Sequence, residues 1–302
     1  MAIDAFLLIL SMLALGYAFA RLKLLPENAA DVLNRVVLYL CLPASILLYL
    51  PRLSPEWRLA GLIAIPWLLA FIVWGLLALL KKPLGWRQDE FAALLLCVML
   101  GNTSFIGYPM IRALQGETAL GYAVIYDQFG TFLLLTSIGL YLCARYSGDA
   151  APKARDIAKR ILRFPPALAL IASLTIMPAD PPDWLRHGLS SLAEALLPLV
   201  MLAVGFSLRF TLPRDELRAL TCGLVGKLLL MPALAWGLAL ALGIEGDLLR
   251  VAVLESAMPG MITAAVLAIA HNLAPRLAAA LVGYGILLAL FTLPAWNWAL
   301  NR

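Results

Sequence analysis

Long apolar runs separated by short polar connections extend along the whole chain. A helix needs about 20 mostly apolar residues to cross the hydrocarbon core of a bilayer, and runs of this length predict ten membrane-spanning helices. Because the runs are continuous, without alternation of apolar and polar positions, they exclude a β-barrel. The predicted spans are residues 4–22, 34–50, 59–80, 91–113, 119–143, 161–178, 189–208, 218–243, 248–270 and 276–300.

The charged connections predict how these spans are oriented. Most lysines and arginines lie in the connections that follow odd-numbered spans, above all in the basic segment 144–160. The positive-inside rule places these connections in the cytoplasm and both termini outside. The first residues carry no lysine or arginine, so we expect the first span to be a retained helix, since signal peptides begin with a positive region.

The basic segment 144–160 is predicted to be a cytoplasmic linker between two repeats of five spans, 1–143 and 161–302. Five is an odd number, so the second half enters the membrane from the opposite side. Two related halves of this kind form an inverted repeat, which is common among secondary transporters. The predicted fold is therefore an all-α membrane protein of ten transmembrane helices in two inverted repeats of five, with broken crossing helices 4 and 9.

Composition narrows the class of protein. Of the 302 residues, 63% are hydrophobic and 14% are charged, against about 45–50% and about 25% in soluble domains. The net charge of +5 belongs to the membrane connections, so we expect a bilayer and no nucleic acid as partner. The sequence contains no Ser-His-Asp set, zinc motif, dinucleotide fingerprint or Walker loop. We therefore predict no enzyme activity and no cofactor.

Two spans contain helix-breaking residues near the middle of the membrane, at Gly101–Pro109 and Glu255–Thr263. With a rise of about 1.5 Å per residue, Asn102 and Pro259 each lie about 16 Å from opposite faces, close to the midplane of a core of about 30 Å. Half-helix N-termini there direct partial positive charge at the crossing. This arrangement predicts a site for a small anion; the alternative is two kinked helices that pack through small residues.

Ionisable side chains within spans form a second group of candidates. A charged residue at the centre of a membrane helix costs about 2.5–3.5 kcal/mol on the insertion scale, so it usually has a function or a partner. Lys227 either binds an anionic substrate or neutralises a buried acid. Asp127 or Glu255 either carries a coupling proton or helps to hold sodium near Asn102. Gln128 extends this polar group, whereas we expect Glu194 to be interfacial.

These motifs resemble those of bacterial members of the auxin efflux carrier family. The residues that carry the resemblance are Gly101–Pro109, Glu255–Pro259, Leu42-Pro43-Ala44, and Lys227 with Pro232. The resemblance implies a fold similar to that of bile acid:sodium symporters, in which a scaffold of spans 1, 2, 6 and 7 holds a transport domain of spans 3–5 and 8–10. It also implies a homodimer in the bacterial inner membrane and export or import of organic anions such as auxins, malonate or malate.

The sequence thus predicts a secondary active transporter of a small mono- or dicarboxylate that works by elevator-type alternating access. The alternatives are a sodium-coupled carrier like the bile acid symporters, a passive anion channel, or a receptor that binds without transport. The predicted substrate-binding residues are Gly101, Asn102, Thr103, Ser104, Met258, Pro259, Gly260, Pro43 and Ser45, and the predicted coupling and charged residues are Asp127, Gln128, Glu255 and Lys227.

Overall fold

The computed structural model describes residues 2–53, 56–148, 153–207 and 214–302, and these ranges are helical without any β-strand. This confirms the all-α class predicted from the continuous apolar runs. The one extended contact within these ranges is an isolated bridge between Gly101 and Gly260.

Six helical segments in the described ranges are long and apolar enough to cross a membrane, as expected for a helical membrane protein. They are Ala29–Arg52, Arg58–Lys81, Glu117–Ser147, Asp183–Ser207, Leu217–Ala241 and Pro275–Leu300. Leu7–Leu22 and Pro165–Thr175 are shorter apolar helices. The count of ten spans and their arrangement in inverted repeats stay predictions.

The helices pack into two compact units, each assembled from segments far apart in the sequence. Unit 1 contains Met1–Pro55, Ser104–Val124 and Leu162–Leu208, and unit 2 contains Glu56–Thr103, Ile125–Ile161 and Arg209–Arg302. The chain passes from unit 2 to unit 1 between Thr103 and Ser104, inside the fourth predicted span. The predicted division into repeats, scaffold and transport domain stays a prediction.

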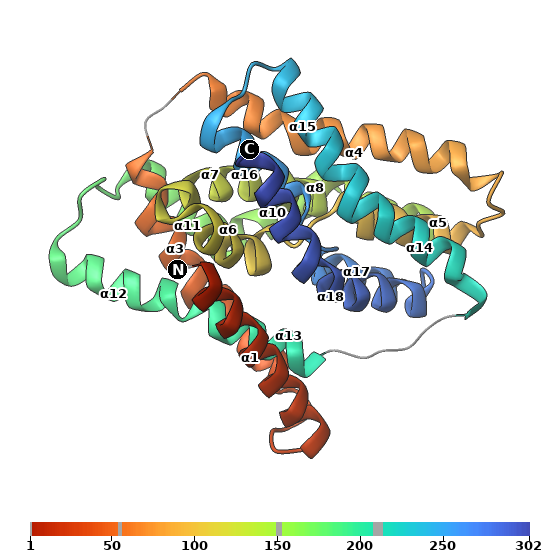
Figure 1. The fold of residues 1–302 in the computed structure, drawn as a ribbon, viewed down its shortest axis with the longest axis horizontal. Coiled ribbons are helices and arrows are strands. Elements are labelled where there is room, and N and C mark those ends of the chain that lie inside the picture. Colours follow the sequence, from red (N-terminus) through yellow and green to blue (C-terminus); the bar gives the residue numbers. More distant parts are fainter. Residues whose placement is uncertain (1, 54–55, 149–152, 208–213) are drawn as a thin grey trace. The chain divides into compact units, whose positions relative to one another are not determined.

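Unit 1 is built around a close helix pair, α1 (Ala2–Leu22) and α13 (Leu196–Ser207), which lie side by side in Figure 1. A Cβ added at Gly16 would lie 2.2 Å from the carbonyl oxygen of Leu202, and one at Gly205 would lie 2.2 Å from that of Leu13. Only glycine permits this approach. The unit also contains α2 (Ala29–Val36), η1 (Val37–Cys41), α3 (Leu42–Tyr49), η2 (Leu50–Arg52), α6 (Tyr108–Gln115), η4 (Glu117–Ala119), α7 (Leu120–Ile125), α11 (Pro165–Thr175) and α12 (Asp183–Glu194).

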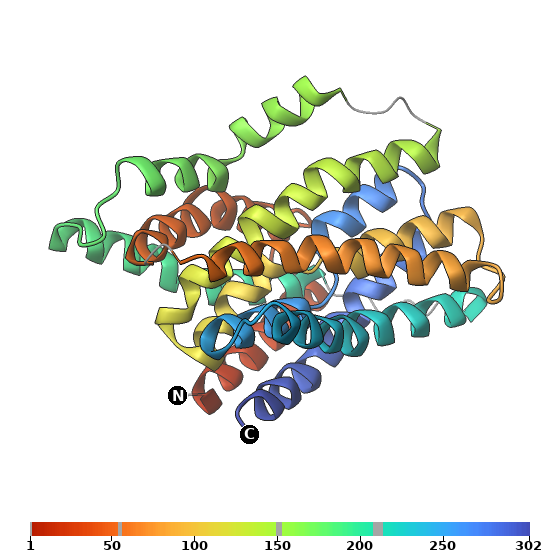
Figure 2. The same ribbon diagram turned by 90° about the horizontal axis from the view of Figure 1, so that it is seen from above.

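Unit 2 is a bundle in which α4 (Arg58–Lys81) packs along α15 (Met231–Ala241), as Figure 2 shows in orange and blue-green. Pro66 lies inside α4, and its ring occupies the space where a side chain at Gly130 would lie. The remaining elements are α5 (Gln88–Met99), η5 (Tyr126–Thr131), α8 (Phe132–Leu134), η6 (Leu135–Gly139), α9 (Leu140–Ser147), η7 (Arg214–Glu216), α14 (Leu217–Val225), η8 (Gly226–Leu230), α16 (Gly246–Ser256), α17 (Ile262–Ala270) and α18 (Pro275–Leu300).

Much of the predicted linker 144–160 is helical. Its first residues end α9, residues 149–152 lie outside the described ranges, and the rest belongs to α10 (Ala154–Arg163). The side chains of Arg155, Lys159 and Arg163 are exposed along α10. The segment is therefore basic, as predicted, but part of it is an ordered helix.

Several membrane helices contain π-helical turns, which insert an extra residue and often occur at functional sites. Asp127 and Gln128 lie in η5, Lys227 lies in η8, and Thr103 begins η3 (Thr103–Gly107). These turns therefore hold most of the polar side chains that the sequence places inside the membrane.

Candidate functional site

Two helices that begin in unit 2 are interrupted where the sequence predicts broken helices. α5 ends at Met99 and helical structure resumes at Thr103, while α16 ends at Ser256 and α17 begins at Ile262. We call residues 100–103 and 257–261 together the paired break. Both segments are buried, so their backbone polar groups need partners inside the protein.

The two interruptions supply these partners to each other. The N–H of Asn102 donates to the carbonyl of Pro259 at 2.8 Å, and the N–H of Met261 donates to the carbonyl of Leu100 at 2.9 Å. The two hydrogen bonds flank the antiparallel bridge between Gly101 and Gly260. The predicted helix breaks thus meet as a short two-stranded contact between segments that are distant in the sequence.

The close approach at the bridge leaves little space for a side chain, above all at Gly260, where the neighbour is backbone. A Cβ at Gly260 would lie 2.8 Å from the carbonyl oxygen of Cys97, and a Cβ at Gly101 would lie 3.0 Å from the Nζ atom of Lys227. The second distance also places the ammonium group of the buried Lys227 directly beside the paired break.

A buried polar cluster surrounds the paired break within unit 2. Its members are at most 3% exposed: Asn102, Thr103, Asp127, Gln128, Lys227, Glu255 and Ser256. The Asp127 carboxylate accepts a hydrogen bond from Thr103 Oγ1 at 2.5 Å and one from Gln128 Nε2 at 2.7 Å. Burying two carboxylates and one ammonium in an apolar bundle costs free energy, and such groups usually have a function. This cluster is therefore a candidate site for ions and polar ligands.

Lys227 is held by the second broken helix. Its Nζ atom donates to the carbonyl of Ser256 at 3.1 Å. The Ser256 hydroxyl donates to the carbonyl of Ala252 at 2.6 Å and lies 2.9 Å from the Tyr126 hydroxyl. A lysine whose ammonium is anchored on a carbonyl keeps its remaining N–H groups for other acceptors.

Several polar atoms of the cluster have no hydrogen-bond partner within the described ranges. They are both side-chain atoms of the Asn102 amide, the Gln128 oxygen, and both carboxyl oxygens of Glu255. A buried polar group without a partner costs about 1–3 kcal/mol, and more when it is charged. Proteins keep such groups where they serve a ligand, an ion or a proton.

The predicted site residues fall in both units. Gly101, Asn102 and Thr103, the segment Met258–Gly260, and Asp127, Gln128, Lys227 and Glu255 all belong to unit 2. Ser104, Pro43 and Ser45 belong to unit 1, where the Ser45 hydroxyl donates to the carbonyl of Cys41 at 2.9 Å. Ser45 also lines a cavity that sequence reasoning did not predict.

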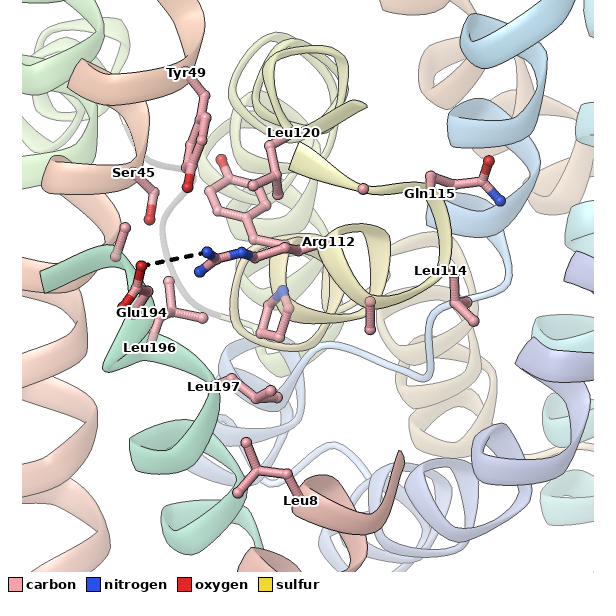
Figure 3. Close-up of a pocket in the computed structure, with 15 residues that line it drawn as sticks. Leu8, Ser45, Tyr49, Arg112, Leu114, Gln115, Leu120, Glu194, Leu196 and Leu197 are labelled. Carbon is pink, nitrogen blue, oxygen red and sulfur yellow. Dashed lines mark ion pairs between the residues drawn. The ribbon is translucent and has the colours of Figure 1, made fainter. Parts of the chain in front are cut away.

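This cavity of about 700 Å³ lies in unit 1 between α3, α6 and the junction of α12 with α13 (Figure 3). Leucines form much of its wall, and Arg112 projects into it opposite Glu194. The Arg112 guanidinium pairs with Glu194 at 3.5 Å and with Glu117. Sequence reasoning missed Arg112, although an arginine three residues after Pro109 in an apolar stretch was a usable signal. It placed Glu194 at the membrane interface and did not predict its pairing with Arg112.

Comparison with known proteins shows that this chain is similar to membrane transport proteins. Residues 1–297 match the family of membrane transport proteins. An uncharacterized transporter from Methanothermobacter thermautotrophicus is 31% identical to this chain, with 97% of each covered. The uncharacterized transporter YfdV from Escherichia coli is 23% identical over 95% of this chain and 94% of its own length. Auxin efflux carrier component 5 from Arabidopsis thaliana is 23% identical over 96% of this chain and 93% of its own length.

Proposed function

Because the chain belongs to the family of membrane transport proteins that includes auxin efflux carriers, we propose that it is a secondary active transporter of a small organic anion. The substrate class is a mono- or dicarboxylate. The observation that carries this proposal is the paired break, which brings two interrupted membrane helices together beside the buried Asn102.

The paired break supplies groups that attract an anion. α17 begins at Ile262, immediately after the break, so the first N–H groups of that helix have no partner within it. These N–H groups carry the positive end of the helix dipole. The Asn102 amide adds hydrogen-bonding capacity, and Lys227 in its protonated form adds a positive charge close to Gly101. Together they favour a carboxylate over a neutral or cationic solute.

The buried acids provide the means of coupling. Glu255 has two unpartnered carboxyl oxygens, and Gln128 and Asn102 each have an unpartnered amide oxygen. Such oxygens suit either a proton on Glu255 or a sodium ion, which takes oxygen ligands. Asp127 already accepts hydrogen bonds from Thr103 and Gln128. We therefore assign the coupling ion to Glu255 before Asp127.

Transport proceeds by an elevator-type movement in this proposal. Spans 3–5 and 8–10 carry the site past a scaffold of spans 1, 2, 6 and 7. The division of the helices into two compact units, with most of the predicted site in unit 2, supports such a movement. The carrier acts as a homodimer in the bacterial inner membrane with both termini outside.

Uptake into proteoliposomes tests the proposal. Radiolabelled malonate, malate and indole-3-acetate are offered with and without gradients of protons or sodium. Wild type should show saturable uptake and counterflow, and Asn102→Ala should abolish both while the protein stays folded. The matched control is Asn28→Ala, because Asn28 is exposed and makes no helix-capping hydrogen bond. Unchanged uptake by Asn102→Ala would refute the site.

The same assay separates the alternatives. A passive channel would show neither saturation nor counterflow, and a receptor would bind ligand without flux. Strict sodium dependence with a steroid substrate would indicate a carrier of the bile acid symporter type. Glu255→Gln should uncouple uptake from the ion gradient, and retained dependence would remove Glu255 from coupling.

A further inference from the structure

The cavity of unit 1 contains the Arg112 guanidinium, which has no role in the transport site proposed at the paired break. Its volume of about 700 Å³ lies in the range of small-molecule sites. Arg112 extends from α6 toward the end of α12, and its guanidinium pairs with Glu194 at 3.5 Å (Figure 3). A guanidinium presents a planar set of donors that matches a carboxylate.

The carboxylates that hold Arg112 are replaceable. The side chains of Glu117 and Glu194 are 53% and 58% exposed, and that of Arg112 is 30% exposed. Ion pairs between exposed groups contribute little to stability because water solvates each partner well. Glu194 also accepts a hydrogen bond from Ser190 at 3.1 Å, so its carboxylate keeps a partner when it leaves Arg112.

Tyr49 adds an unused donor at the same place. Its side chain is 4% exposed, and its hydroxyl has no hydrogen-bond partner within the ranges that the structure describes. In Figure 3 the Tyr49 hydroxyl points toward the Arg112 guanidinium. A carboxylate bound to Arg112 can accept the hydroxyl hydrogen of Tyr49, which would satisfy this buried group.

The leucines of the cavity wall determine which kind of molecule can be attached to the carboxylate. Leu8, Leu120, Leu196 and Leu197 line the cavity, and Arg112 is the one cationic residue among the described residues that line it. A second carboxylate on the same ligand would face leucines or the negative charge of Glu194. The cavity therefore suits one carboxylate joined to an apolar body.

We propose that this cavity binds an apolar monocarboxylate, whose carboxylate replaces Glu194 on Arg112. The inference rests on the proposed function, and it names the cation that would hold the carboxylate. Arg112 and Glu194 both belong to unit 1, so the exchange takes place within one compact unit.

Calorimetric titration of the purified chain in lipid nanodiscs tests the proposal. The probes are hexanoate and phenylacetate, with succinate as a dicarboxylate and hexan-1-ol as an apolar molecule without a carboxylate. Hexanoate and phenylacetate should bind at least tenfold more tightly than the other two. Binding of hexan-1-ol or succinate as tight as that of hexanoate would overturn the proposal.

Variants at Arg112, Tyr49 and Glu194 test which residues bind the carboxylate. Arg112→Ala should weaken hexanoate binding at least 30-fold, and Tyr49→Phe should weaken it three- to tenfold. Glu194→Gln should strengthen binding at least threefold because it removes the competing charge, a gain that misfolding cannot produce. The control is Arg250→Ala, since Arg250 is similarly exposed, pairs with Asp247 at 3.3 Å and lies outside this cavity. Unaltered affinity in both Arg112→Ala and Glu194→Gln would overturn the proposal.

These results separate the two proposals. If the titrations fail while Asn102→Ala still abolishes uptake, the cavity inference is wrong and the proposed function stands. If the titrations succeed while Asn102→Ala transports normally, the cavity site stands and the paired break is not the transport site.

Discussion

Replacing Gly260 by alanine tests the paired break most directly. The added Cβ would lie 2.8 Å from the Cys97 carbonyl oxygen, whereas ordinary contacts begin at about 3.4 Å, so the segment must move by about 0.6 Å. A shift of that size away from α5 would lengthen the bonds of 2.8 and 2.9 Å to about 3.4–3.5 Å, beyond the usual limit of about 3.2 Å.

The expected loss of stability follows from the weakening of these two hydrogen bonds. A buried backbone group that loses its partner costs about 1–3 kcal/mol. With one group left unpaired at each of the two bonds, we therefore expect Gly260→Ala to lower the free energy of unfolding by about 2–6 kcal/mol. Since about 1.4 kcal/mol corresponds to a factor of ten, an active state that requires the paired break should lose at least tenfold in transport rate.

Thermal unfolding of the protein in detergent measures the loss of stability. Cys41, Cys97 and Cys143 are buried free thiols, so a thiol-reactive dye reports their exposure on unfolding. The control is Gly237→Ala, because a Cβ at Gly237 in α15 meets no atom within 4 Å. Alanine there should raise stability by up to about 1 kcal/mol. Equal midpoints and equal uptake for the two variants would refute the reasoning.

Three further predictions concern other contacts. Gly205→Ala should separate α1 from α13 and lower the thermal midpoint, whereas Gly188→Ala, with open space around it, should not; equal midpoints would contradict the close packing. Lys227→Met removes the donor to the Ser256 carbonyl, so it should lower the free energy of unfolding by about 1–3 kcal/mol and abolish anion uptake; full uptake would exclude Lys227 from the site. Tyr126→Phe removes one hydroxyl contact with Ser256 and should cost about 1 kcal/mol in the same melting assay; no change would show that this contact is dispensable.

The positions of the helix breaks could be predicted because their causes are local. Glycine and proline in Gly101–Pro109 and Pro259–Gly260 weaken helices whatever surrounds them. The partner of each break could not be read from one sequence, since several neighbours can satisfy freed backbone groups. The hydrogen bonds between Asn102 and Pro259 and between Met261 and Leu100 depend on how the bundle packs.

The cavity around Arg112 was missed for a related reason. Its wall comes from α1, α3, α6, α7, α12 and α13, so no single run of the sequence describes it. The π-helical turns were missed too, because an extra residue in a turn leaves the apolar pattern almost unchanged. The helix α10 lay within a segment whose charge suggested a linker, although Ile157 and Ile161 recur at helical spacing.

The bridge between Gly101 and Gly260 has a consequence for biogenesis. Roughly half of the chain separates its two sides, so the ribosome delivers the first side long before the second. Until α16 and α17 enter the membrane, the N–H of Asn102 and the carbonyl of Leu100 must find temporary partners such as water or the insertion machinery. A chain truncated before α16 would keep these groups exposed, and quality-control proteases should remove it quickly.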